Sequence, residues 1–264
     1  MKALSLLVAL SCTACSPAPE APAELADLSL YLFAEFHADD ADVLAGLENL
    51  SDILHNDFDY DADVSERQLK QPPLTEEFLG GANTTSAFDP DLQKTVSIAY
   101  RSRYPISRHV AGTLILDQNP LEPSATTHDR TVLSDGDCWV ATDCDTLDTV
   151  NFIVKSNVLY TVPYDATKVY RRLTLDDGRD ALMARVDQPE IGYSDTGTTS
   201  IDQNFSLEIW VEDKADAAQS LRIQFVWTAL TIEGIDLESM NIDGILTPGM
   251  EDTMIAHDTW YDEH

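Results

Sequence analysis

The chain has 264 residues with 47 acidic and 16 basic side chains, so its formal net charge is −31 at pH 7 with neutral histidines. A surface this acidic repels nucleic acid and anionic lipid head groups, which argues against both as partners of the folded body. Hydrophobic residues make up 44% of the chain, enough for a packed core, and no apolar run is long enough to span a membrane.

The N-terminal segment MKALSLLVALSCTAC has the three parts of an export signal. Lys2 precedes an apolar run over residues 3–10, and small residues then lead to Cys15. The run is too short to cross a bilayer, which favours an export signal over a membrane-spanning helix. We therefore expect residues 1–14 to be a signal peptide.

The last three residues of this segment, TAC, resemble the cleavage box of bacterial lipoproteins, although Cys12 stands where that family usually has leucine. The resemblance implies that Cys15 becomes the lipid-bearing first residue of the mature protein. Several acyl chains would then hold it in the lipid bilayer. Ser16, where retained lipoproteins have aspartate, favours the outer membrane. The alternative is an ordinary cleaved signal that leaves the protein soluble in the periplasm.

A proline-rich spacer, PAPEAPA, occupies residues 17–23. Its prolines favour an extended polyproline conformation of about 3.1 Å per residue, so the spacer is roughly 20 Å long. We expect residues 15–23 to be the lipidated cysteine and a tether, and residues 24–264 to form a single acidic domain.

Apolar side chains recur with helical period over residues 24–37 and 41–55, which predicts two amphipathic helices. Asp39 or Asp40 is placed to cap the second helix. The short turn between them predicts an antiparallel helical hairpin. Residues 56–92 are polar and contain paired prolines and glycines, so we expect a loop with one short helix.

From about residue 94 the apolar pattern alternates, as it does in strands. Asp176, Asp177 and Gly178 supply the turn of one hairpin. Two further strands each carry an alternating apolar face, so these faces can share one core. The residues of those faces are Phe205, Leu207, Ile209 and Val211, and Leu221, Ile223, Phe225 and Trp227. The expected strands are 94–100, 108–116, 148–155, 157–163, 167–175, 180–187, 204–212 and 220–231.

The tail, residues 236–264, becomes helical again, with Thr247 and Pro248 at the start of the last helix. The apolar side of this helix carries Met250, Met254 and Tyr261. The predicted fold class is α+β: an N-terminal helical hairpin, an antiparallel twisted sheet of seven or eight strands curled into a partial barrel, and a C-terminal helix. This outline resembles the helix-grip arrangement of START-type lipid-binding domains. It departs from them because START domains open on a strand and close on one long helix, which Pro248 interrupts here.

Cys138 and Cys144 lie close together in GDCWVATDCD. In an oxidising compartment such a pair forms a disulfide, worth about 2 kcal/mol for so short a loop. A zinc site would need further ligands that are not nearby, and a redox motif would have tighter spacing. We expect a structural disulfide.

Basic residues are few, so their placement is informative. Arg171 and Arg172 are adjacent on one expected strand, and Arg185 is on the next. The structural interpretation is pairing with carboxylates across neighbouring strands. The functional alternative makes these three arginines the candidate residues for binding an anionic head group, with at most one of Arg171 and Arg172 facing a cavity.

Asp57, Asp59, Asp61 and Asp63 alternate in DFDYDADVSE and make a candidate Ca²⁺ site. The glycine and glutamate that an EF-hand requires are missing from this loop. A solvating acidic surface is the competing interpretation. Ca²⁺ is the one cofactor that the pattern suggests.

None of the common catalytic motifs occurs in the sequence, so no catalytic residues are predicted. The leading hypothesis is a non-enzymatic envelope lipoprotein that binds an apolar or amphiphilic ligand or a protein partner. A second hypothesis is a cell-envelope hydrolase, which would need His109 or His128 within reach of a serine and an aspartate. A third is a purely structural surface lipoprotein.

Overall fold

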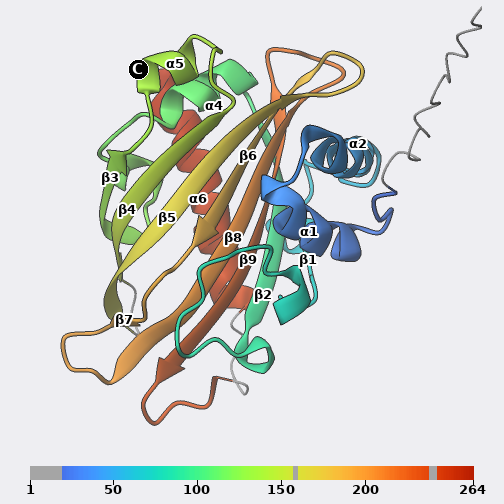
Figure 1. Ribbon diagram of the computed structural model, residues 1–264. Coiled ribbons are helices and arrows are strands. Elements are labelled where there is room, and N and C mark those ends of the chain that lie inside the picture. The colour runs from blue at the N-terminus through green and yellow to red at the C-terminus, as the bar shows by residue number, and fades with distance from the viewer. Residues whose placement is uncertain (1–19, 157–159, 238–242) are drawn as a thin grey trace, which may run out of the picture.

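The computed structural model describes residues 20–156, 160–237 and 243–264 (Figure 1). The expected signal peptide, Cys15 and the first part of the tether lie outside these residues, so their roles stay predictions. In the described part, no helix is long and apolar enough to cross a membrane.

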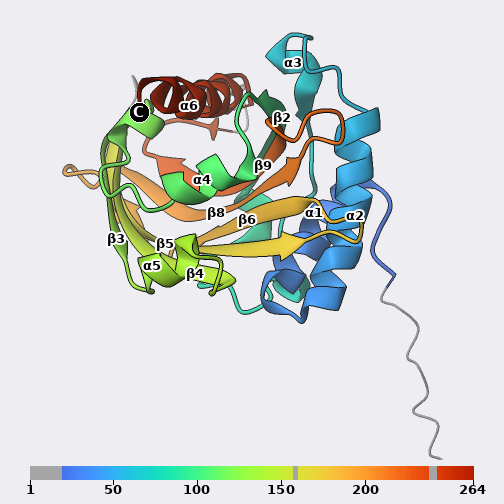
Figure 2. The ribbon, with the colours of Figure 1, turned by 90° about the horizontal axis from the view of Figure 1, so that it is seen from above.

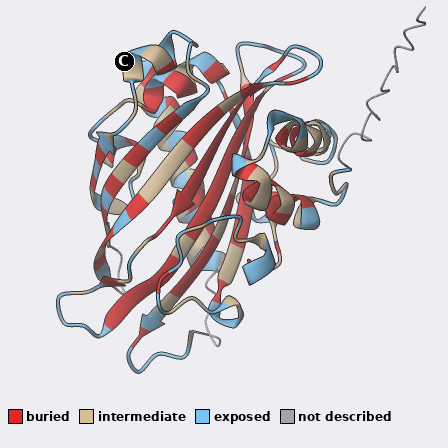
Figure 3. Cartoon of the chain, in the orientation of Figure 1, coloured by how far each residue is buried: buried red, intermediate tan, exposed pale blue. Residues whose placement is uncertain are grey.

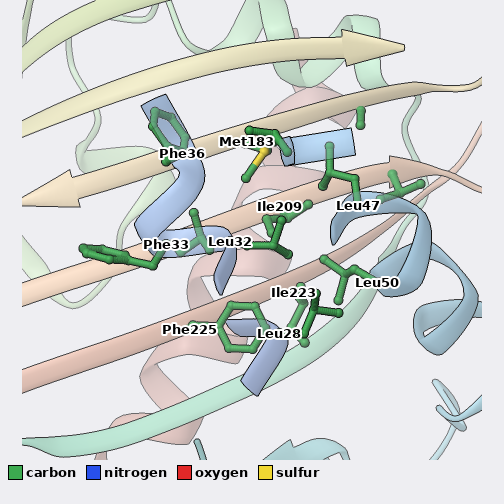
Figure 4. Packing of buried hydrophobic residues seen from close by; sticks show 14 of the residues in the cluster. Leu28, Leu32, Phe33, Phe36, Leu47, Leu50, Met183, Ile209, Ile223 and Phe225 are labelled. Atoms are coloured by element: carbon green, nitrogen blue, oxygen red, sulfur yellow. The ribbon is translucent and has the colours of Figure 1, made fainter. Parts of the chain in front are cut away.

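Two helices form where the apolar period predicts them. α1 spans Leu25–Ala34 and continues as a 3₁₀ turn, η1, over Glu35–His37, whereas α2 spans Asp40–Asn56. Gly46 allows the two helices to pack closely, because a Cβ atom there would lie 2.5 Å from the side chain of Leu32. Their apolar stripes pack on the sheet and form one core with it (Figure 4).

The segment between α2 and the sheet is mostly loop, as expected. Its short elements are α3 (Val64–Arg67), β1 (Gln68–Leu69) and the 3₁₀ turns η2 (Glu76–Phe78) and η3 (Pro90–Leu92). The two-residue strand β1 was not predicted, and it pairs with β2 at one edge of the sheet.

An antiparallel sheet of nine strands forms the centre of the described structure. The strands run in the order β1-β2-β9-β8-β6-β5-β4-β3, and β7 pairs with β8. The sheet is open, and it is less curled than the partial barrel that we expected. The remaining strands are β2 (Lys94–Ser102), β3 (Ala125–Val132), β4 (Thr146–Ser156), β5 (Thr161–Thr174), β6 (Asp180–Asp187), β7 (Gly192–Tyr193), β8 (Thr199–Glu212) and β9 (Ser220–Ile232).

The sheet is covered on both faces, with α1 and α2 on one side and α6 on the other (Figure 2). We call these the hairpin face and the α6 face. The predicted apolar sets on β8 and β9 both lie in the core of the hairpin face, which confirms that they share one core. Residues between them, such as Glu208 and Arg222, therefore point to the α6 face. Because both faces are covered, β6, β8 and β9 are buried along most of their length (Figure 3).

The strand predicted over residues 108–116 is wrong. The chain forms a helix there instead, α4, over Ile106–Gly112, preceded by Pro105 at the N-cap. Ile106, His109 and Val110 are buried on it at helical spacing. The apolar alternation in the sequence suggested a strand, but a proline favours a helix start here and the buried residues recur with a period near 3.6.

The observed strands differ from the predicted ones in two further ways. Residues 161–163 and 167–174, predicted as parts of two strands, belong to one long strand, β5, and residues 157–159 lie outside the described part. β3 was not predicted, because its inward-facing residues are polar: His128 and Arg130 are buried where a strand normally carries apolar side chains. This is the first indication that the α6 face has a polar interior.

The expected disulfide joins Cys138 to Cys144, whose Cα atoms lie 5.4 Å apart. The first cysteine belongs to a short helix, α5, over Gly136–Val140. The side chain of Asp135 caps this helix by accepting hydrogen bonds from the backbone N–H groups of Asp137 and Cys138, at 3.0 and 3.1 Å.

The C-terminal helix α6 spans Asp243–Glu263, a single helix of 21 residues with Pro248 inside it. The prediction that it starts at Thr247 and is interrupted by Pro248 is therefore wrong. A proline in the second turn removes one backbone hydrogen bond, and the packing of the remaining turns outweighs this loss. Met250 and Met254 are buried against β2, as the apolar stripe predicted.

Candidate functional site

A cavity of about 410 Å³ lies between α6 and the α6 face of the sheet. Its wall comes from α4, α6 and the strands β3–β6, β8 and β9. The large aromatic residues of β8 and β9 do not fill this space. Phe225 and Trp227 pack on the hairpin face, whereas Trp210 lines the cavity together with tyrosines such as Tyr164 and Tyr170.

Part of the wall is apolar. On the strands, Ile153, Tyr164, Val186 and Ile201 belong to one buried cluster and line the cavity together. On α6, the residues that line it include Leu246 and recur at helical spacing towards Tyr261. The other lining residues of α6 are Gly249, Met250, Thr253 and His257.

Glu208 of β8 is the centre of a buried ionic group. It is 6% exposed and accepts hydrogen bonds from Lys168 Nζ at 2.9 Å and Arg222 Nη2 at 3.0 Å. Burial alone would raise the pKa of the Glu208 carboxyl, but Lys168 and Arg222 outweigh it and lower that pKa. Burial likewise opposes the charge on Lys168, yet Glu208 keeps the pKa of Lys168 above its ordinary value. Glu208 and Lys168 are therefore both ionised at neutral pH.

A second ionic group lies on the loop before β3. Glu122 is paired with Lys155 of β4 and with His128, whose Nδ1 lies 2.5 Å from Glu122 Oε2. Lys155 Nζ also donates to Ser124 Oγ at 2.7 Å. Burial acts against ionisation of Glu122, but Lys155 and His128 hold the pKa of this carboxyl well below its ordinary value.

Arg130 of β3 is 5% exposed and is bonded to neutral oxygen atoms. Its Nε donates to Asn151 Oδ1 at 3.0 Å, and its Nη1 donates to the carbonyl of Thr113 at 2.7 Å. The guanidinium lies over the ring of Tyr170, 5.4 Å from the centroid. Among the described residues, no carboxylate forms an ion pair with Arg130.

His109, the candidate base of a hydrolase, lines the cavity with Nε2 3.1 Å from Ser102 Oγ. Ser102 Oγ in turn donates to Asp258 Oδ1 at 2.5 Å. In a catalytic triad the acid orients the histidine, whereas here it bonds the serine, and His109 Nδ1 has no partner in the described part of the chain. Burial, with a smaller effect of Arg222, lowers the pKa of His109 to about 3, so it is a poor base. This group fastens α6 to β2 and α4.

The three arginines predicted as ligand candidates are not among the residues that line the cavity. Arg171 and Arg185 lie on the hairpin face, where they bond the N-terminal helices through carbonyls of Phe36 and Phe33 at 2.6 and 3.1 Å. Arg172 donates to the carbonyl of Cys144 at 2.7 Å and lies over Trp139. Their observed contacts are structural.

The candidate Ca²⁺ loop is not assembled as a metal site. Within the described residues, no group of three or more His, Cys, Asp or Glu side chains is arranged to hold a metal ion. Asp59 instead caps its own turn by accepting from the backbone N–H of Asp61 at 3.0 Å. The other three candidate ligands also join no such group: Asp57, Asp61 and Asp63.

Four charged residues of the cavity were not predicted from the sequence: Arg130, Lys168, Glu208 and Arg222. A signal was nevertheless present on β8 and β9. The residues between the two apolar sets combine charges with Trp210 and Val226, a mixture that a solvent-facing strand surface does not normally carry.

No protein-family model and no curated protein matches this sequence. Solved structures similar to it include the STAR-related lipid transfer protein of Xanthomonas axonopodis, 13% identical over 65% of this chain and 96% of that chain, with a TM-score of 0.41. The lipid transfer and protein localization domain of human StarD13 is 10% identical over 64% and 79% of the two chains, with a TM-score of 0.37. A START superfamily protein of Mycobacterium smegmatis is 7% identical over 64% and 97%, with a TM-score of 0.38.

Proposed function

We propose that this chain is a non-enzymatic binding protein whose cavity holds one apolar or amphiphilic small molecule. The observation that carries the proposal is the cavity itself. Its volume of about 410 Å³ falls within the range of small-molecule pockets, and its wall combines apolar side chains with a few fixed charged groups. The wall could orient such a molecule, and among its described residues no nucleophile is bonded to a histidine that a carboxylate orients.

The energetics of the cavity support a resident ligand. An unfilled apolar cavity costs roughly 20–25 cal/mol per Å³, so a volume of this size would cost several kcal/mol if nothing occupied it. Water can satisfy the charged part of the wall but gains little against Ile153, Tyr164 and Val186. A molecule with an apolar part satisfies both.

We further propose that the protein is exported and held at the cell envelope, in the outer membrane, by acyl chains on Cys15. The lipobox-like segment and the proline-rich spacer at residues 17–23 support this. A body with a net charge near −31 is repelled by anionic head groups. The lipid would therefore act as a tether, and the ligand would come from the aqueous envelope or be drawn from the bilayer into the cavity.

The binding proposal is tested by filling the cavity from Gly249. This residue lies on the cavity side of α6, and a Cβ atom there would meet nothing within 4 Å. We expect Gly249→Phe to weaken binding of 1-decanol about tenfold or more, because the ring occupies ligand space. Gly249→Ala is the matched control and should bind 1-decanol as the unsubstituted chain does.

Titration calorimetry on the exported Cys15→Ser chain, which carries no acyl anchor, measures both variants. Replacing glycine inside a helix favours the helix, so loss of binding cannot be ascribed to a weakened α6. Equal binding by the Phe and Ala variants, or no binding by either, would leave a structural surface protein as the better interpretation.

The anchor proposal is tested in cells that are fed an alkyne-labelled fatty acid. We expect the unsubstituted chain to take up the label and to sediment with membranes, and Cys15→Ser to do neither. Cys12→Leu is the matched control, because it removes the other nearby cysteine and supplies the residue usual in lipoproteins. Retained labelling of Cys15→Ser would disprove the assignment of Cys15.

A further inference from the structure

The charge of the cavity wall is opposite to that of the chain. Among the described residues that line it, the charged side chains are the cations Arg130, Lys155, Lys168 and Arg222 and the carboxylates Glu122 and Glu208. The wall thus carries a surplus of two positive charges in a chain whose net charge is −31. A quarter of the 16 basic residues has gathered on this one internal surface.

The surplus is concentrated around Tyr170. Arg130 and Lys168 lie over the same ring, 5.4 and 5.2 Å from its centroid, and Lys168 shares Glu208 with Arg222. Two of these three cations therefore share one carboxylate, and Arg130 forms no ion pair with a carboxylate of the described residues. The other ionic group, Glu122 with Lys155, balances its own charge.

The hydrogen bonds of this group are also incomplete. Arg222 and Trp210 are 2% and 3% exposed, yet Arg222 Nε and Trp210 Nε1 have no hydrogen-bond partner among the described residues. The two residues are paired in register across β8 and β9, and the guanidinium lies 4.7 Å from the indole ring. Both atoms can only donate, so each needs an acceptor that the described protein does not supply.

Two of the three histidines that line the wall, His109 and His257, add nothing to the surplus. Burial, aided by Arg222, lowers the pKa of His257 well below its ordinary value, and that of His109 falls to about 3. Both rings are neutral at physiological pH. The positive charge therefore comes from lysine and arginine side chains and persists across the physiological range.

Resting on the function proposed above, we infer that the bound molecule is an anionic amphiphile whose carboxylate or phosphate head group lies among Arg130, Lys168 and Arg222. Such a head group supplies both the negative charge and the acceptor oxygens that the wall lacks. On β5, Tyr164 and Ala166 precede Lys168 at alternate positions and so share its face of the sheet. Both belong to the apolar cluster of the wall, which would receive the apolar part of the molecule.

The inference is tested with ligands of one chain length that differ in head group: decanoate, decyl phosphate, 1-decanol and decylammonium. Titration of the exported Cys15→Ser chain should show decanoate or decyl phosphate binding about tenfold or more tightly than 1-decanol, and decylammonium binding more weakly than 1-decanol. A preference for decyl phosphate over decanoate would assign the head group to a phosphate ester, and the reverse to a carboxylate.

Two substitutions with opposite expected signs sharpen the test. Arg130→Met removes a cation, so the preference for decanoate over 1-decanol should fall about tenfold. Glu208→Gln removes the competing carboxylate, so the same preference should rise. Arg101→Met is the control, because Arg101 is exposed and pairs with Asp213 outside the cavity. A ratio measured within each variant does not depend on the fraction of folded protein.

The outcomes separate the two proposals. If 1-decanol binds as tightly as decanoate and Gly249→Phe blocks both, the binding function stands and the anionic head group is refuted. Tighter binding of decylammonium, or a fall in decanoate preference in Glu208→Gln, also refutes it. If no probe binds, both proposals fail.

Discussion

Arg185 on the hairpin face and Arg222 on the α6 face are both almost fully buried, at 1% and 2% exposure, but their guanidinium groups are satisfied differently. Each nitrogen of Arg185 donates to the protein: Nε to Asp187, and Nη1 and Nη2 to carbonyls that include Phe33 and Leu79. Arg222 has one ionic partner, which it shares with Lys168, and its Nε has no partner in the described structure.

This difference is the reason for proposing a ligand beside Arg222 and not beside Arg185. Burial does not separate them, because both side chains are inside. The separating property is whether the protein itself supplies the acceptors and the countercharge. On the hairpin face it does, and there the arginines fasten α1 and the following loop to the sheet. On the α6 face the described residues supply them only in part, and there the cations line a cavity.

The largest predicted effect concerns the hairpin face. Arg185→Met would leave Asp187 without its ionic partner and three carbonyls without their donor, in a region with little water. We expect the free energy of unfolding, measured by urea denaturation, to fall by about 3–5 kcal/mol.

The matched control for Arg185→Met is Arg172→Met, which removes an arginine that donates to a single carbonyl and is only partly buried. That substitution should cost about 1 kcal/mol. Similar losses for the two variants would mean that the bonds of Arg185 do not hold the helices, and the contrast between the faces would lose its basis.

Much of the fold could be predicted from the sequence where one period dominates. The alternation of Phe205, Leu207 and Ile209 indicated the core of the hairpin face, and the helical stripes indicated α1 and α2. The cavity could not be predicted, because it depends on which strands are neighbours in the sheet and on how α6 covers the α6 face. The polar residues of β3 hid that strand for the same reason: they face a charged interior and not solvent.

A pH titration examines the α6 face. The pKa of His109 is lowered from its ordinary 6.5 to about 3, chiefly by burial and then by Arg222. Between these values the unfolded chain binds a proton that the folded chain does not, so stability falls as pH falls. His109 alone should account for about 2 kcal/mol of lost unfolding free energy between pH 7 and pH 5.

The measurement is urea denaturation at a series of pH values. Between pH 7 and pH 5, the free energy of unfolding of His109→Gln should fall by about 2 kcal/mol less than that of the unsubstituted chain. His264→Gln, at an exposed position of the C-terminus, is the control and should leave the slope unchanged. An unchanged slope in His109→Gln would show that the cavity admits a protonated imidazole and is wetter than its burial indicates.

The smallest predicted effect returns to the comparison between arginines. Arg130→Met removes a buried cation that has only neutral oxygen partners, and the methionine can still pack on Tyr170. Losing two hydrogen bonds is largely offset by no longer burying an uncompensated charge, so the free energy of unfolding should fall by about 1 kcal/mol or less. Decanoate should stabilise the unsubstituted chain more than this variant, since a ligand stabilises in proportion to its affinity for the folded state. A loss as large as that of Arg185→Met would mean that Arg130 stabilises the fold as Arg185 does. The arginines of the two faces would then not differ in role.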